Sequence, residues 1–350
     1  MASYILKRLL LMLPTLFGVM LVTFAVTQFV PGGPVEQLIS QIEGSGANGG
    51  EISSSSAGLY QGNKGMEQEQ IDKIKALYGF DKPAYQRFYE MMLRFIQFDL
   101  GESYFHNQSV VELIISKLPV SISLGVWSFL IVYLICIPLG IKKAVRDGSK
   151  FDVISSTLVL TGYAIPGFVL GIALLVLFGG GSFYDVFPLK GLVSDNWHEL
   201  PWYQQITDYL WHMVLPIIAS TIGSFAVLTM LTKNSFLEEI SKQYVLTARA
   251  KGLDESSVLY RHVFRNAMIP IITGFPGAFI AAFFTGSLLI ENIFSLDGLG
   301  LLAYDSILKR DYPVVLGSLF FFTILGLIAK LLADISYVII DPRIQFDSVD

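Results

Sequence analysis

The residues of this sequence best placed to do chemistry are charged side chains that stand inside long apolar runs. Lys330 and Asp334 are four residues apart in one run, and Glu291 lies near the end of another. In a membrane such groups can relay ions. They can also pair on one helix face, which lowers the cost of burying both charges. Both interpretations stay open from the residues alone.

The residue combinations that enzymes use do not occur in the sequence. It contains no H-E-x-x-H or G-x-S-x-G motif and no paired carboxylates. Its four histidines are scattered along the chain: His106, His198, His212 and His262. Its single cysteine, Cys136, cannot form an internal disulfide or a zinc cluster and is interpreted as a small buried hydrophobe. We therefore expect neither a catalytic centre nor a metal site, and the chain is not expected to be an enzyme.

The composition indicates a membrane protein. Of the 350 residues, 53% are hydrophobic and 15% are charged, whereas soluble globular proteins carry about 25% charged residues. Charged residues are absent from stretches of about 20 residues and are concentrated between them, which is the pattern of membrane helices. The net charge of −5 gives no reason to expect nucleic acid as a partner.

Six apolar segments are long enough to cross about 30 Å of hydrocarbon as helices. None alternates as a barrel strand would, so the sequence predicts an all-α integral membrane fold with six transmembrane helices. The segments are Leu9–Val30, Pro119–Ile141, Val153–Phe178, Met213–Thr232, Ala267–Ile293 and Pro313–Ile340. The first is longer than the apolar region of a secretory signal, so we expect it to be retained as a signal anchor.

The distribution of Lys and Arg predicts the orientation. With the N-terminus inside, the inner segments 1–8, 142–152, 233–266 and 341–350 hold thirteen of these residues in 63 positions. The outer segments 31–118, 179–212 and 294–312 hold only ten in about 140 positions. Both termini are therefore expected on the cytoplasmic side.

Two outer segments have distinctive composition. The first, 31–118, contains a Gly- and Ser-rich stretch at 43–65 that should be flexible. Helical periodicity at Glu67–Tyr78 and Pro83–Phe98 predicts short helices at the outer surface. The second, 179–212, is dense in aromatic residues, which we interpret mainly as an interfacial belt.

The inner segment 233–266 is too long for a hairpin and too short for an enzyme domain. It predicts one short helix over Phe236–Lys251 with Gly252 as its C-cap, and a second helix capped by Asp254. Val258, Leu259, Val263 and Phe264 would share one face of the second helix. An apolar face with a basic rim suits docking into a groove on a soluble partner, or resting on anionic lipid. Physical reasoning alone leaves both open.

Part of this loop resembles a known family. Tyr244–Gly252, followed by Arg261-His262 and Arg265–Pro270, resembles the characteristic cytoplasmic loop of binding-protein-dependent ABC importer permeases, most closely their peptide and nickel branch. The family motif is Glu-Ala-Ala, three residues and Gly. Ala248 and Gly252 keep the second Ala and the Gly. Leu246 and Thr247 replace the Glu and the first Ala, as is common in the peptide branch.

Further stretches resemble the same branch in the same order along nearly the whole chain, except for the Gly/Ser insertion. They include Pro31–Pro34, Tyr78–Pro83, Phe98–Ser103, Leu118-Pro119, Pro138–Ile141, Phe294–Gly300, Arg310–Pro313 and Asp341–Arg343. Together with the insertion, Asp208–His212 and Leu231–Phe236 are most similar to the first permease subunit of microcin C-type oligopeptide importers.

The resemblance implies a type I ABC importer permease of the bacterial inner membrane that moves oligopeptides or peptide-like solutes. Its implied partners are a homologous second permease in a heterodimer, two ATPase subunits or one fused ATPase, a periplasmic solute-binding protein and membrane lipid. No G-x-x-x-x-G-K-[ST] motif occurs in this chain, so the partner ATPase subunits would bind ATP and Mg²⁺, and this chain would hold no cofactor.

The implied organisation has four parts. They are an N-terminal transmembrane helix at 1–30, a periplasmic segment at 31–118, a permease core at 119–341 with a cytoplasmic coupling loop at 233–266, and a cytoplasmic tail at 342–350.

The resemblance also suggests which residues act. Coupling to the ATPase would use Tyr244, Ala248, Arg249, Lys251, Gly252, Val258, Arg261, His262 and Asn266. The solute path is expected among polar or helix-breaking positions of the spans: Tyr163, Pro166, Ser220, Ser224, Thr285 and Ser287. For each position of the second set, helix kinking or close helix packing is the favoured alternative to solute contact.

Two other functions compete with this one. A secondary transporter or channel driven by an ion gradient would use Lys330, Asp334 and Glu291 as its relay, and uptake would need no ATPase subunit. A passive membrane scaffold would have no use for the asymmetric loop at 233–266.

Overall fold

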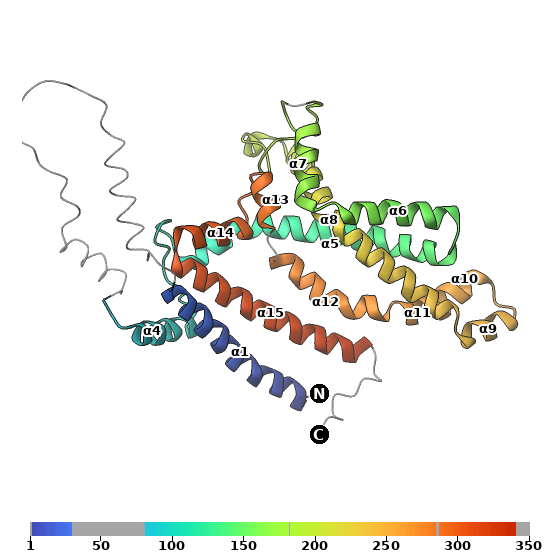
Figure 1. The fold of residues 1–350 in the computed structure, drawn as a ribbon, viewed down its shortest axis with the longest axis horizontal. Coiled ribbons are helices and arrows are strands. Elements are labelled where there is room, and N and C mark those ends of the chain that lie inside the picture. Colours follow the sequence, from blue (N-terminus) through green and yellow to red (C-terminus); the bar gives the residue numbers. More distant parts are fainter. Residues whose placement is uncertain (1, 30–80, 182, 285–286, 341–350) are drawn as a thin grey trace, which may run out of the picture. The chain divides into compact units, whose positions relative to one another are not determined.

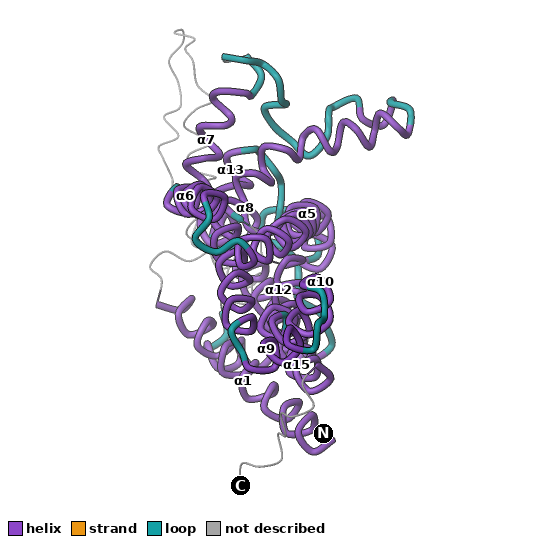
Figure 2. Tube along the Cα trace, turned by 90° about the vertical axis from the view of Figure 1, so that its right-hand side faces the viewer, coloured by secondary structure: helices purple, strands orange, loops and turns teal. Residues whose placement is uncertain are grey.

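The computed structural model describes residues 2–29, 81–181, 183–284 and 287–340. In these ranges the chain forms helices joined by turns, as Figure 2 shows, and the described residues contain no β-strand. Two isolated bridges occur, Glu102 with Ser109 and Gly179 with Phe187. The helical fold class expected from the apolar runs is therefore confirmed for the described part of the chain.

The helices are labelled in Figure 1. Their bounds are α1 Ala2–Phe29, α4 Ala84–Ile96, α5 Val110–Val145, α6 Lys150–Ala164, α7 Gly167–Phe178, the 3₁₀-helix η1 Trp197–Glu199, α8 Trp202–Ile240, α9 Gln243–Ala250, α10 Glu255–Ser257, the π-helix η2 Val258–Val263, α11 Phe264–Ala267, α12 Ile269–Phe284, α13 Leu288–Ile293, α14 Leu299–Lys309 and α15 Tyr312–Ile340.

Four helices are long and apolar enough to cross a membrane individually: Tyr4–Phe29, Val110–Val145, Trp202–Ile240 and Tyr312–Ser336. Two bent pairs meet the same criteria together, Lys150–Ala164 with Gly167–Phe178 and Glu255–Ala267 with Ile269–Ile280. The described residues thus offer four to six spans. The predicted number of six is reached only if each bent pair crosses as one span.

One predicted span, Val153–Phe178, is not a single helix. It is divided between α6 and α7, whose axes meet at 94°. The break lies at Ile165 and Pro166, where Ile165 leaves the helical conformation with a ψ of 119°. The proline explains the break, because its ring disfavours the helical conformation of the residue before it.

Other boundaries also differ from the predictions. Ala267–Ile293 is divided into α12 and α13, and Met213–Thr232 is only the middle of the 39-residue α8. The helix α14 was not predicted. In the first outer segment, α4 forms within the predicted range Pro83–Phe98, whereas Glu67–Tyr78 and the stretch 43–65 lie outside the described residues.

The chain divides into two compact units. Unit 1 comprises Met1–Leu9, Ser116–Leu302 and Leu325–Asp350, and unit 2 comprises Leu10–Ile115 and Ala303–Ile324. In unit 2 the fully buried Asp311 accepts hydrogen bonds from the hydroxyl of Ser103 and the backbone N–H of Tyr104. Phe95 of α4 packs on Phe320 of α15, with ring centroids 4.9 Å apart. These contacts hold α4 and the turn before α5 against the first turns of α15.

In unit 1, α8 packs closely against α5. A Cβ atom built on Gly140 of α5 would lie 2.5 Å from Cβ of Thr232 and 2.8 Å from the carbonyl oxygen of Thr229, both on α8. Small residues at a helix interface permit such close approach of two backbones in a membrane.

We predict that Gly140→Ala lowers the thermal unfolding midpoint of the detergent-solubilised chain, because overpacking of this kind costs about 1–3 kcal/mol. The matched control is Gly223→Ala in α8, where no atom lies within 4 Å of the added Cβ. This control should not lose stability, because alanine favours a helix over glycine. Equal midpoints for the two variants would contradict the close packing of α5 on α8.

Candidate functional site

The predicted loop starts later than expected, because α8 continues to Ile240 before the chain turns. The single helix predicted over Phe236–Lys251 is therefore wrong. Ser241 donates a side-chain hydrogen bond to the carbonyl of Glu238 at 2.8 Å, and Lys242 is extended with a ψ of 152°. Such bonds from serine to nearby backbone compete with helix continuation, which explains the break. We call residues 241–267 the loop segment.

The turn after α9 requires glycine at position 252. The N–H of Gly252 bonds to the carbonyl of Arg249 at 2.9 Å, and the N–H of Leu253 bonds to that of Ala248 at 3.4 Å. These two bonds make a Schellman motif. Gly252 has a φ of +80°, a conformation that side chains with a Cβ rarely adopt. No atom lies within 4 Å of a Cβ built there, so the backbone conformation and not crowding selects glycine.

Asp254 caps the next helix, as predicted. Its carboxylate accepts hydrogen bonds from the hydroxyl of Ser256 at 2.6 Å and the N–H of Ser257 at 2.9 Å. These bonds hold the pKa of the Asp254 carboxyl well below its usual range, so it stays ionised at neutral pH. Beside the turn, Arg249 forms a two-point ion pair with Glu255, at 2.9 and 3.0 Å. The pair joins the end of α9 to the start of α10.

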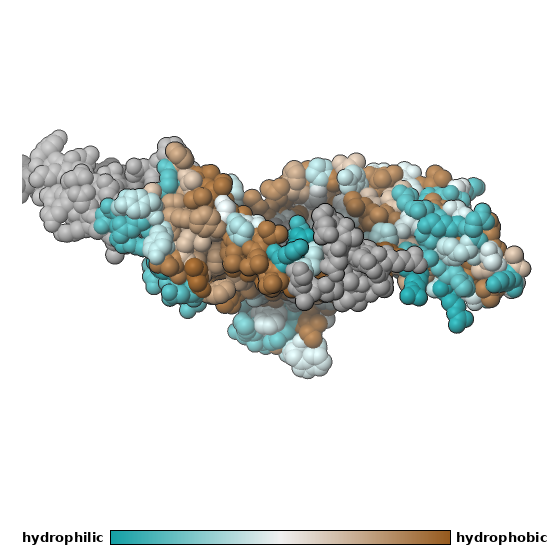
Figure 3. Space-filling view, turned by 90° about the horizontal axis from the view of Figure 1, so that it is seen from below, coloured by the Kyte–Doolittle hydropathy of each residue, from teal (hydrophilic) through white to brown (hydrophobic). Residues whose placement is uncertain are grey.

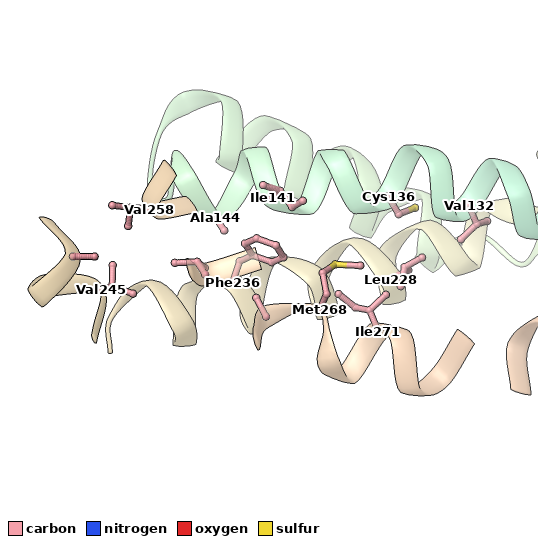
Figure 4. Close-up of a cluster of buried hydrophobic side chains, with 13 residues drawn as sticks. Val132, Cys136, Ile141, Ala144, Leu228, Phe236, Val245, Val258, Met268 and Ile271 are labelled. Carbon is pink, nitrogen blue, oxygen red and sulfur yellow. The ribbon is translucent and has the colours of Figure 1, made fainter. Parts of the chain in front are cut away.

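The loop segment has no separate core, because its buried side chains pack on α5 and α8. Val258 and Val263 lie five residues apart at the two ends of the π-helix η2, and each is only 1% exposed. An i→i+5 helix brings residues at this spacing to one side. They share one cluster with Val245 of α9, Phe236 of α8 and Ala144 of α5, as Figure 4 shows.

Burial divides the predicted coupling residues into two groups. Ala248 and Val258 are buried in this cluster, where they pack the loop segment on α5 and α8, and their role in coupling stays a prediction. Tyr244 and His262 are half-buried, and Tyr244 donates a hydrogen bond to Glu239 at 2.6 Å. The exposed members are Arg249, Lys251, Gly252, Arg261 and Asn266.

Three exposed apolar side chains of the loop segment were missed by the sequence analysis. They are Leu246, Leu253 and Tyr260, exposed by 50%, 42% and 63%. For Leu246 and Tyr260 the available signal was their position one or two residues from the buried Val245 and Val258, and Leu253 had no such signal. We define the loop surface as these three side chains together with Arg249, Lys251 and Arg261. In Figure 3 hydrophilic side chains gather at the right-hand end, where Figure 1 places α9 and α10.

The structure does not gather the predicted solute-path residues into one site. Tyr163 is exposed beside the bend at Pro166, and Ser224 is exposed on α8. Ser220 donates its hydroxyl to the carbonyl of Pro216 at 2.7 Å, and the N–H of Ser287 donates to Glu291 at 3.2 Å. Thr285 lies outside the described residues. A groove of about 500 Å³ between α5 and α8 is lined by Trp127, Leu210, Ile217, Phe225 and other residues, among them Thr221, a further polar solute-path candidate beside Ser220.

The charged residues of the apolar runs have partners other than those predicted. Asp334 pairs with Arg8 of α1 at 3.1 Å and accepts a hydrogen bond from Tyr4 at 3.0 Å. The predicted pair with Lys330 is therefore wrong, and Lys330 is exposed. The partners of Asp334 thus come from α1, a different helix, and not from a residue one turn away on its own helix.

Glu291 is fully buried and serves as an anchor for the turn that follows α13. Its carboxylate accepts hydrogen bonds from the N–H of Leu301 at 2.7 Å and the hydroxyl of Ser121 at 3.4 Å. A Cβ built on Gly298 would lie 2.5 Å from its carboxyl carbon, so the turn closes directly over the carboxylate. These contacts explain Glu291 structurally. In the described ranges, no three His, Cys, Asp or Glu side chains are grouped as a metal ion would require.

Comparisons with known proteins give the family. Residues 136–346 match the family model described as binding-protein-dependent transport system inner membrane component. The chain is 57% identical to the peptidoglycan transport system permease protein YejB of Agrobacterium fabrum, over the full length of both chains. It is 53% identical to the inner membrane ABC transporter permease protein YejB of Escherichia coli O157:H7, over 99% of this chain and 100% of that one.

A more distant relative covers the same length. The dipeptide transport system permease protein DppB of Escherichia coli K12 is 32% identical, over 99% of each chain. The match to the family model spans more than half of the chain, and the three relatives align along nearly all of it. This chain therefore belongs to the binding-protein-dependent transport system inner membrane component family, the membrane permeases of ABC transporters.

Proposed function

We propose that this chain is the transmembrane permease subunit of an ATP-driven importer for oligopeptides or peptide-like solutes. The observation that carries the proposal is its full-length similarity to permeases named for peptidoglycan, dipeptide and oligopeptide transport, the last being AppB of Bacillus subtilis at 32% identity. The solutes would include peptides of the microcin C type. The chain would lie in the bacterial inner membrane with both termini in the cytoplasm.

The partners follow from the same family. A homologous second permease would complete the solute path, and a periplasmic binding protein would deliver the solute. Two ATPase subunits, or one fused ATPase, would bind ATP and Mg²⁺ and supply the energy. Closure of the ATPase pair on ATP would move the two loop segments together and switch the spans between inward and outward openings.

The loop surface is the part of this chain that we assign to ATPase contact. Leu246, Leu253 and Tyr260 offer apolar anchors that are about half-exposed. Lys251 and Arg261 are exposed beside them, whereas Arg249 is already paired with Glu255. Apolar anchors supply most of the affinity of an interface, and charges mainly supply specificity. This division supports docking on a protein groove over contact with lipid phosphates alone.

The competing ion-gradient mechanism has less support in the described residues. Glu291 is enclosed by hydrogen bonds, and Asp334 is paired with Arg8. Both carboxylates therefore already have partners within the protein in place of a transported ion.

The test of the function is uptake of labelled peptides into liposomes that contain both permeases and the ATPase subunits, with binding protein added. We expect uptake that requires ATP hydrolysis and persists when ionophores collapse ion gradients. Uptake that follows an ion gradient without any ATPase subunit would instead establish the secondary transporter.

We predict that Leu253→Ala combined with Tyr260→Ala weakens retention of the ATPase subunits about tenfold or more, because truncating interface anchors commonly costs more than 1 kcal/mol each. Retention is measured by co-purification in mild detergent. The control is Tyr203→Ala, which truncates a 54% exposed tyrosine at the other end of α8. Equal retention by both variants would remove the loop surface from the ATPase contact.

Substitutions at Gly252 separate backbone conformation from charge. Asparagine and aspartate have nearly the same size, and both adopt positive φ more readily than other residues. We predict that Gly252→Asp inserts normally but abolishes transport and weakens ATPase association, because its negative charge stands beside Lys251. Gly252→Asn should retain most of the transport. Normal uptake by Gly252→Asp would contradict the assignment, and an equal loss in both variants would contradict the role of charge.

A further inference from the structure

Four charged side chains join α8 to the hairpin of α5 and α6. Asp152, at the start of α6, pairs with Lys143 of α5 at 3.1 Å and with Lys233 of α8 at 2.7 Å. Lys233 also reaches Asp147, in the turn between α5 and α6, at 2.8 Å. Two lysines and two aspartates balance in charge. Lys143 is fully buried, and Asp152 and Lys233 are only 5% and 9% exposed.

Lys143 is the fixed part of this network. Besides its ion pair with the Asp152 carboxylate, the ammonium group of Lys143 donates a hydrogen bond to the backbone carbonyl of Asp152 at 3.0 Å. It also donates to the hydroxyls of Ser155 and Ser156 at 2.9 and 2.6 Å. All of these partners lie on α6. A fully buried ammonium group has no water to replace them, so Lys143 stays in place. It binds the two arms of the hairpin to each other.

Lys233 is the part of the network that can open. It is the member that comes from α8, and its second partner, Asp147, has a side chain that is 53% exposed. If Lys233 withdraws, Asp152 keeps Lys143 and the N–H of Gly148, which donates to it at 3.2 Å. Withdrawal of Lys233 therefore leaves Asp152 with partners. An unpaired buried carboxylate, which makes breaking a buried ion pair costly, does not result.

The position of Lys233 connects the network to the loop segment. Phe236, one turn further along α8, lies in the cluster that holds Val258 of the loop segment and Ala144 of α5, as Figure 4 shows. The loop segment and Lys233 are therefore connected through one turn of α8.

We propose that Lys233 is a positioning residue for energy coupling. Its ion pairs with Asp152 and Asp147 clamp α8 to the hairpin of α5 and α6, so that movement of the loop segment moves these three helices together. This inference rests on the proposed function of the chain. Without the clamp, the ATPase subunits still cycle, but less of their motion reaches the spans, and fewer peptides cross for each ATP hydrolysed.

The experiment measures the ratio of peptide imported to ATP hydrolysed by the complete complex in liposomes. Lys233→Met keeps the length of the side chain and removes its charge. We expect a loss of this ratio, because ATP is then hydrolysed without the matching movement of the spans. Lys233→Arg, which can bind both carboxylates, should keep the ratio near the wild-type value.

The matched control is Lys143→Met, which removes the other lysine from the same carboxylate but leaves α8 paired through Lys233. It should lower the thermal unfolding midpoint and leave the ratio unchanged. An equal fall of the ratio in both methionine variants, or no fall in Lys233→Met, overturns the clamp.

The outcomes also separate the clamp from the proposed function. If the wild-type complex shows no ATP-dependent uptake, the proposed function and the clamp fail together. If the wild type is coupled and Lys233→Met keeps its ratio, the clamp alone fails. Should Lys233→Met not accumulate, Lys233→Gln replaces it, because its amide can still donate a hydrogen bond to Asp152 but cannot form the ion pairs. The ratio should then fall in the same direction, and an unchanged ratio overturns the clamp.

Discussion

The apolar cluster that the loop segment shares with α5 and α8 is the interaction on which the rest of the structure depends. Helices as short as α9 and η2 are not stable alone in water. They persist here because Val245 and Val258 pack on Phe236 and Ala144. The loop segment and the ends of two apolar helices are therefore one body. A protein that binds the exposed side of the loop segment acts directly on α5 and α8.

Within the loop segment, buried and exposed residues have separate tasks. The buried valines set its orientation, and the turn at Gly252 and the cap at Asp254 set the path of its backbone. These devices use local hydrogen bonds and leave the loop surface free. The separation means that a substitution on the loop surface can change its contacts without changing the packing that holds the loop segment.

The sequence predicted features that depend on neighbouring residues and missed those that depend on distant ones. The turn at Gly252 and the cap at Asp254 were predictable, because positive φ and capping are local. The partner of Asp334 was not, since Arg8 lies at the opposite end of the chain. Lys143 was counted only as one more basic residue of an inner loop, because no local pattern distinguishes a buried lysine from a solvated one. Which coupling candidates face outward likewise depended on packing, as the buried Ala248 and the exposed Arg249 illustrate.

The length of α8 has a mechanical consequence. Lys233 lies 7 residues from the end that leads into the loop segment and 31 residues from the end at Trp202. Held at Lys233, the helix is a lever with unequal arms, and a rigid tilt would enlarge a displacement roughly fourfold, since each residue adds about 1.5 Å to either arm. A shift of a single ångström at the short arm is then enough to move the far end by about the width of a water molecule or more. A small displacement at the end that leads into the loop segment would thus become a displacement of molecular size at the far end of α8.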